Sequence, residues 1–283
     1  TININKNMAQ VTLADIQKLR KATSAGMMDC KKALEEAEGD FDKAVEIIRK
    51  RGQMVASKRA DRTATEGVVL AKVSDNAKFG VIITLNCETD FVAKNAEFIA
   101  LAQIIVDTAL SQKPSDLEQL KAIVVDGRPI ENHVMEKIGV TGEKMDLSYY
   151  GSITAEKVTA YIHPGNQVAC IVGFNKSGLD EQVYKDIAMQ VAAMNPVAVD
   201  KENVTKERIE KELEIGREQA RLEGKPENMI DKIAEGKLNK FFKESTLLNQ
   251  EFIKDNKKSV RQYLQSIDKD LNVTGFCRFS LKD

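Results

Sequence analysis

Residues 81–102 read VIITLNCETDFVAKNAEFIALA and join a strand pattern directly to a helix pattern. The first five residues are mostly β-branched and apolar, which favours a buried strand. Helical spacing then begins and continues to residue 109, with the apolar residues Phe98, Leu101, Ala102, Ile105 and Ala109. A second strand-like run, 68–73, lies just before, and the polar residues 74–76 between the two runs predict a turn. The stretch therefore predicts an α+β subdomain.

A similar pattern returns later in the chain. Residues 158–162 and 168–172 are strand-like, and His163-Pro164-Gly165-Asn166 between them predicts a turn. A helix follows at the spacing of Val183, Ile187, Val191 and Met194. We therefore expect an α+β core of two related subdomains with antiparallel sheets. The alternating run 273–279 predicts a closing strand in one of these sheets.

The chain on either side of this core is predicted to be helical. Residues 12–48 show three short stretches of helical spacing, with a capping box at Thr12 and Asp15 and an N-cap at Asp40. The basic segment 49–66 that follows is expected to be a connector. Between 200 and 243, 22 of 44 residues are charged, and Gly224-Lys225-Pro226 interrupts two helical runs. This pattern predicts a protruding antiparallel helical hairpin. Two copies of the chain could associate through the hairpin or the core.

The domain organisation follows from these patterns. We predict a three-helix domain at 8–52, a linker at 53–66, a first core subdomain at 67–145, a second core subdomain at 146–199 and 244–283, and the helical hairpin at 200–243.

Composition and motifs exclude several functions. The 283 residues carry 42 Lys+Arg against 43 Asp+Glu, mixed along the chain, so direct nucleic-acid binding is not expected. A secretory leader and a membrane span are not expected either. The four cysteines lie far apart in sequence, which predicts four buried, reduced thiols in a cytoplasmic protein rather than a metal site.

Catalysis has little support in the sequence. The common phosphate-loop, dinucleotide, zinc-protease and hydrolase motifs are missing, so we expect neither an enzyme nor a bound cofactor. His163 falls in a predicted turn, where a solvated residue is the usual finding. Cys87 lies near carboxylates that discourage its ionisation. A thiol- or metal-dependent enzyme would require the scattered cysteines to converge.

Two short stretches allow two interpretations each. After the strand at 81–85, Thr89 or Asp90 could cap a helix while Phe91 folds back into the core. Periodicity favours this first interpretation. In the alternative interpretation, Phe91 protrudes as an anchor for a partner. Met27 and Met28 either fill the core of the three-helix domain or border a contact surface. Lys31 and Lys32 suit either a solvated face or an acidic helix of a partner.

These same stretches, GMMDCKKAL at 26–34 and TDFVAK at 89–94, closely resemble the signatures of bacterial translation elongation factor Ts, and the resemblance extends from about residue 8 to residue 283. The resemblance implies an N-terminal domain similar to ubiquitin-associated domains. It also implies a cytosolic protein that binds elongation factor Tu and releases its GDP, so that GTP can rebind. A ubiquitin-associated-like adaptor without exchange activity is the alternative.

The resemblance further implies which residues contact the partner. Asp90 and Phe91 would enter between two helices of the nucleotide-binding domain and disturb the site that holds the magnesium ion. The remaining contact residues would lie in the two motifs and at matching positions elsewhere: Thr89, Val92, Met27, Met28, Lys31, Ile138, Gly139, His163 and Ile253.

Overall fold

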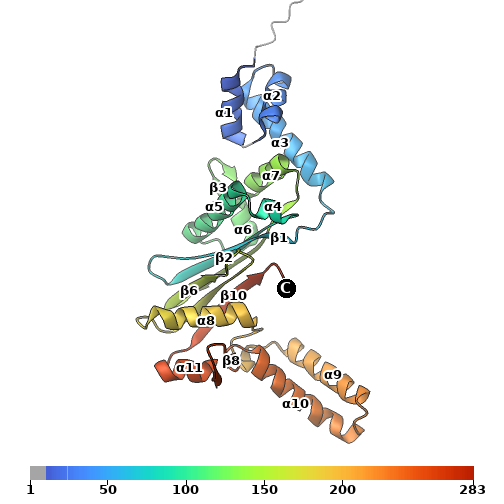
Figure 1. The fold of residues 1–283 in the computed structure, drawn as a ribbon, viewed down its shortest axis with the longest axis vertical. Helices are drawn as coiled ribbons and strands as arrows, with labels where there is room; N and C mark the ends of the chain where they lie inside the picture. The colour runs from blue at the N-terminus through green and yellow to red at the C-terminus, as the bar shows by residue number, and fades with distance from the viewer. Residues whose placement is uncertain (1–10, 24) are drawn as a thin grey trace, which may run out of the picture. The chain divides into compact units, whose positions relative to one another are not determined.

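The computed structural model describes residues 11–23 and 25–283 and shows an α+β fold, as predicted (Figure 1). Met8 and the seven residues before it lie outside the described residues. The chain divides into two compact units. Unit 1 comprises Thr1–Leu70, Ile83–Tyr150 and Leu281–Asp283, and unit 2 comprises Ala71–Ile82 and Gly151–Ser280. The domain boundaries given above stay a prediction.

Unit 1 begins with three helices, as the sequence predicts: α1 (Leu13–Thr23), α2 (Met27–Glu36) and α3 (Phe41–Lys58). The predicted capping box forms at the start of α1, where Thr12 and Asp15 each donate a backbone N–H to the other's side chain. Asp40 caps α3 by accepting from the Lys43 N–H. Their small core consists of Ile16, Leu19, Ala25, Cys30, Ala33, Leu34, Ala37, Ala44 and Ile48.

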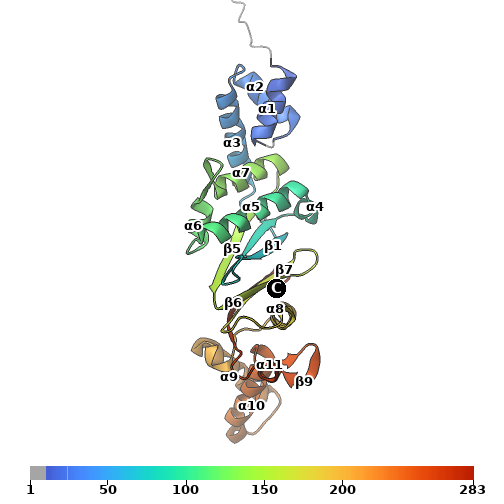
Figure 2. The same cartoon turned by 90° about the vertical axis from the view of Figure 1, so that its left-hand side faces the viewer.

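Helix α3 runs further than expected, because it continues to Lys58 through the first part of the expected connector. Helix α7 (Ile130–Thr141) supports this extension (Figure 2). At the contact, a Cβ on Gly139 would lie only 2.8 Å from the Cα of Gly52. Packing against a distant helix thus stabilises a segment whose own apolar period fades.

The first three-stranded sheet has the order β1-β2-β5, with β1 (Glu66–Val73), β2 (Phe79–Cys87) and β5 (Met145–Thr154). The predicted turn separates β1 from β2, and the predicted helix follows as α5 (Ala96–Gln112). The one-turn helix α4 (Asp90–Ala93) lies between β2 and α5. Unit 1 also contains α6 (Leu117–Ala122) and the short strands β3 (Val124–Val125) and β4 (Arg128–Pro129).

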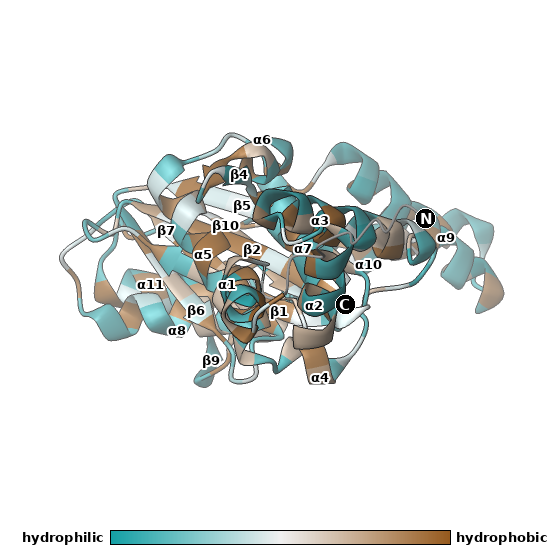
Figure 3. Cartoon of the chain, turned by 90° about the horizontal axis from the view of Figure 1, so that it is seen from above, coloured by the Kyte–Doolittle hydropathy of each residue, from teal (hydrophilic) through white to brown (hydrophobic). Residues whose placement is uncertain are grey.

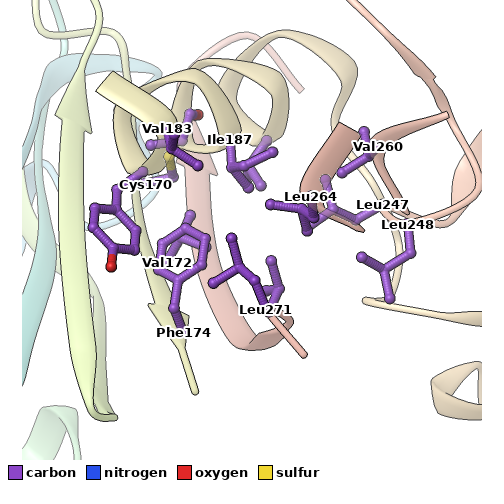
Figure 4. Close-up of a cluster of buried hydrophobic side chains, with 14 of the residues drawn as sticks. Cys170, Val172, Phe174, Val183, Ile187, Leu247, Leu248, Val260, Leu264 and Leu271 are labelled. Carbon is purple, nitrogen blue, oxygen red and sulfur yellow. Dashed lines mark hydrogen bonds between the residues drawn. The ribbon is translucent and has the colours of Figure 1, made fainter. Parts of the chain in front are cut away.

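Unit 2 contains the second predicted strand pair and its helix, as β6 (Lys157–Ile162), β7 (Val168–Phe174) and α8 (Glu181–Met194). The predicted closing strand, β10 (Val273–Ser280), pairs antiparallel with β7 and gives the order β10-β7-β6. Side chains of the sheet, α8 and the C-terminal segments meet in one apolar core, which includes Val172, Phe174, Ile187, Leu248 and Leu264 (Figure 4).

The predicted helical hairpin is present as α9 (Lys206–Leu222) and α10 (Glu227–Ser245), preceded by the short helix η1 (Lys201–Asn203). Gly224 adopts a φ of 69° between the two helices. At their contact, a Cβ on Gly216 would lie 3.1 Å from the Cα of Ala234. After the hairpin, the chain forms β8 (Glu251–Phe252), β9 (Asp255–Ser259) and α11 (Val260–Ile267).

The close approach of α3 and α7 makes Gly139 sensitive to substitution. We expect Gly139→Ala to lower the melting temperature, because the added methyl group would meet backbone atoms of Gly52 at 2.8 Å. Gly236→Ala in α10 is the matched control, since its Cβ would meet nothing within 4 Å. That control should stabilise its helix by up to about 1 kcal/mol. Thermal unfolding followed by circular dichroism compares the two variants, and equal shifts of the same sign would contradict the packing described.

Candidate functional site

The stretch after β2 forms a capped, exposed turn. Thr89 is the N-cap of α4, and its hydroxyl accepts from the Val92 N–H at 3.4 Å. The Phe91 side chain is 83% exposed, whereas Ala93 on the same turn is buried. Figure 3 draws much of α4 brown because Phe91, Val92 and Ala93 are apolar residues. Of the two predicted caps, Thr89 rather than Asp90 is the N-cap. The interpretation that places Phe91 in the core is wrong, because Ala93 takes the inward position of this turn.

The charge beside the exposed ring is fixed by a local ion pair. The Lys94 Nζ lies 2.6 Å from the Asp90 carboxylate, one helical turn away. This hydrogen bond lowers the pKa of Asp90. Asn95 then caps α5 by accepting from the Glu97 N–H at 2.9 Å. The turn therefore presents an aromatic ring next to an ionised carboxylate.

The base of the turn is held by a residue distant in sequence. The Glu143 carboxylate accepts from the Thr89 backbone N–H at 3.1 Å and from the Thr89 hydroxyl at 2.7 Å. The Cys87 thiol donates to the Thr89 carbonyl oxygen at 3.2 Å. Glu143 cannot be identified from the sequence, because no local pattern relates position 143 to position 89.

Glu88, next to the cap, joins the same region to the end of α3. Its carboxylate accepts from the Lys144 N–H at 2.7 Å and from the Arg59 guanidinium at 2.9 and 3.1 Å. The Lys144 N–H and the charge of Arg59 lower the pKa of Glu88. The Lys144 Nζ in turn donates to the carbonyl oxygens of Ala60 and Arg62. Polar contacts thus surround the turn on its inner side.

Helix α2 carries a second exposed apolar surface in unit 1. Met27 and Met28 are 40% and 64% exposed, so the interpretation that they fill the core is wrong. The inward positions of α2 are taken by residues further along the helix, Cys30, Ala33 and Leu34, which are buried. Lys31 is exposed and lies 3.8 Å from Glu35 in a weak ion pair.

The two candidate residues on α7 differ in accessibility. Ile138 is only 6% exposed, so its side chain belongs to the interior of unit 1. Gly139 is exposed and lines a 310 Å³ pocket together with Ala25, Asp29 and Met54. The structure therefore brings Gly139 close to the start of α2.

In unit 2, His163 and Ile253 lie together although they are far apart in sequence. Both line a mostly apolar pocket of 280 Å³, with Tyr161, Val168, Met189, Ala192 and Ala193. The His163 Nδ1 is 3.1 Å from the Tyr161 hydroxyl, and the imidazole is exposed on its turn, as predicted. This arrangement offers an apolar surface with a polar edge formed by His163 and the Tyr161 hydroxyl.

The cysteines are not gathered into a reactive site. Cys30, Cys87 and Cys170 are buried, whereas Cys277 is half-buried, which corrects the expectation of four buried thiols. Cys277 lies on β10, which pairs antiparallel with β7. Within residues 11–23 and 25–283, no three His, Cys, Asp or Glu side chains are placed to hold a metal ion. The helices of this described part include none that is long and apolar enough to cross a membrane.

Contiguous exposed apolar patches are typical of proteins that act by contacting another macromolecule. The comparisons with known proteins agree with this class. A family model described as "Elongation factor TS" matches residues 88–283, more than half of the chain. The chain therefore belongs to the elongation factor Ts family, and this membership supports a nucleotide-exchange role in translation elongation.

Similar proteins named "Elongation factor Ts" align over nearly the whole chain. The protein of Porphyromonas gingivalis is 55% identical over 272 residues, which are 96% of this chain and 98% of the relative. The protein of Christiangramia forsetii is 51% identical over 276 residues, covering 97% of this chain and 100% of the relative. The protein of Amoebophilus asiaticus is 52% identical over 270 residues, covering 95% and 98%.

The thiol beside the turn should be chemically inert. Burial, and then the nearby Glu143 carboxylate, raise the pKa of Cys87 to about 12. Because a thiol below its pKa is protonated, Cys87 should not react with an aromatic disulfide reagent between pH 7 and 9 in the folded protein. We expect Cys277 to react first, and Cys277→Ser to remove this rapid phase. A rapid phase that survives Cys277→Ser and disappears in Cys87→Ser would contradict the assignment.

Proposed function

We propose that this chain is the guanine-nucleotide exchange factor for elongation factor Tu in the cytoplasm. It binds the GDP-bound factor, disturbs the magnesium and phosphate site, and promotes release of GDP so that GTP can rebind. The observation that carries the proposal is the Phe91 ring, 83% exposed on a capped turn in a member of this family. The chain needs no cofactor of its own, since the nucleotide and the metal belong to the partner.

Exchange requires a difference in affinity rather than a chemical step. A factor that binds the nucleotide-free partner more tightly than the GDP-bound partner must weaken GDP binding by the same factor. Changing a site from nearly full to nearly empty takes about 5.5 kcal/mol of differential binding. Burying one phenylalanine side chain contributes roughly 1.5–3 kcal/mol. Contacts beyond Phe91 are therefore needed.

Unit 1 would supply the contacts that act on the nucleotide site. Phe91 and Asp90 enter between two helices of the partner's nucleotide-binding domain, and Thr89 and Val92 frame them. The ionised Asp90 brings negative charge toward a site that also holds phosphates, which favours departure of the nucleotide.

The remaining residues would mainly hold the two proteins together. Met27 and Met28 offer an adaptable apolar surface, and Lys31 adds a positive charge beside it. On α7, Gly139 provides the contact while the buried Ile138 supports it from below. His163 and Ile253 in unit 2 form a separate apolar contact. Several moderate contacts together provide the free energy that one aromatic ring cannot.

We expect Phe91→Ala to reduce the maximal rate of GDP release from elongation factor Tu by about 10- to 100-fold, because roughly 1.5–3 kcal/mol of burial is lost. The side chain is exposed in the free chain, so the melting temperature should change little. Stopped-flow release of a fluorescent GDP analogue measures the rate. Val124→Ala removes another exposed apolar side chain of unit 1 and should leave the rate unchanged. A folded Phe91→Ala protein with wild-type exchange would disprove the wedge assignment.

Met27→Ala and Lys31→Ala should instead raise the half-saturating concentration in the same assay by about 3- to 10-fold, with little change in the maximal rate. These residues are assigned to association and not to displacement of the nucleotide. Lys50→Ala is the matched control, because Lys50 forms a similar ion pair with Glu46 one helical turn away on α3. Unchanged concentration dependence for both variants would remove α2 from the contact surface.

A further inference from the structure

We propose that Glu143 is a positioning residue for the Phe91 wedge, an inference that rests on the proposed function. Glu143 lies 52 residues after Phe91 in sequence and does not belong to the turn that carries the ring. It acts through Thr89, whose backbone N–H and hydroxyl both donate to the Glu143 carboxylate.

Helix α4 cannot hold Phe91 in place by itself. It has only four residues, far fewer than an isolated helix needs to be stable in water. The Phe91 ring is 83% exposed, so its own burial contributes almost nothing to fixing the turn. Ala93 is the only buried residue of the turn and has a single methyl group. The orientation of the ring must therefore depend on polar contacts at the start of the turn.

Those contacts converge on Thr89 and lead from Glu143 to the residue after Phe91. The Thr89 hydroxyl donates its one proton to Glu143 at 2.7 Å, and the same oxygen accepts from the Val92 N–H at 3.4 Å. The Glu143 carboxylate also accepts a hydrogen bond from the Thr89 N–H at 3.1 Å. A carboxylate that accepts two hydrogen bonds fixes both the backbone and the side-chain rotamer of the cap. The backbone on either side of Phe91 is thereby set.

Glu143 is itself placed by a stiff segment. The preceding Gly142 ends α7 with a φ of 72°, a conformation that favours glycine. The Glu143 N–H donates to the Thr141 hydroxyl at 3.3 Å, and the next N–H, of Lys144, donates to Glu88 at 2.7 Å. Backbone contacts on both sides of Glu143 therefore fix its position independently of Thr89.

The test compares three variants in the exchange assay. Glu143→Ala should lower the maximal rate by about 10- to 100-fold, because misplacing a group that acts by position has effects of this size. Its half-saturating concentration should change by less than about 3-fold, since α2 and the unit 2 pocket are untouched. Glu143→Gln can still accept from the Thr89 N–H and donate to its hydroxyl, so it should retain most of the rate.

Asp116→Ala separates positioning from general stability. Asp116 caps α6 in the same unit, where it accepts from the Gln119 N–H and the Ser115 hydroxyl, both at 2.8 Å. Its loss should lower the melting temperature about as much as Glu143→Ala while leaving exchange unchanged. Hydrogen exchange of the peptide at 88–95 should accelerate in Glu143→Ala and not in Asp116→Ala.

A double variant tests the route through the ring. If Glu143 acts by orienting Phe91, the variant with both Glu143→Ala and Phe91→Ala should exchange no more slowly than Phe91→Ala alone. Full additivity of the two effects would overturn the inference. A wild-type rate in Glu143→Ala, with Phe91→Ala still impaired, would also overturn the inference about Glu143. The proposed function would stand in that case. A wild-type chain that fails to release GDP overturns both.

Discussion

An aromatic side chain that faces water cannot be fixed by the hydrophobic effect, which ordinarily holds aromatic rings in place. Phe91 is in that situation, and the structure replaces burial with directed hydrogen bonds at the residue two positions before it. Thr89 uses its N–H, hydroxyl and carbonyl groups, toward Glu143, Val92 and Cys87. The rest of the proposed mechanism depends on this substitution of polar contacts for packing.

A similar arrangement fixes the N-terminal helices within unit 1. Arg49 of α3 and Arg128 of β4 both bond the largely buried carboxylate of Glu136 on α7. The glycine contact between α3 and α7 allows the two backbones to approach closely. The hydrogen bonds to Glu136 define the geometry more sharply than buried apolar area does, because hydrogen bonds are directional. The α2 surface and the Phe91 turn are therefore both carried by one ordered unit.

The features predicted from sequence are those determined by neighbouring residues. The strand-to-helix pattern at 81–109, the cap at Thr89 and the capping box at Thr12 depend on spacings of a few positions, and all are present. The extension of α3 was not predictable, because it depends on Gly139 more than eighty residues away. The exposure of Phe91 could not be predicted from the spacing of apolar residues either. Phe91 is exposed and Ala93 is buried on a turn that is too short to show a helical period.

A wedge that is ordered before binding has a thermodynamic advantage. If the turn sampled many conformations, the apparent affinity for the partner would fall by the fraction of molecules in the competent one. Ordering it during folding, through Glu143 and Thr89, removes this loss from the binding step. Under the proposed function, the free energy gained when the ring enters a pocket of the partner is then available to distinguish the nucleotide-free partner from the GDP-bound partner. A contact that involves neither protein's reactive chemistry can in this way set a rate.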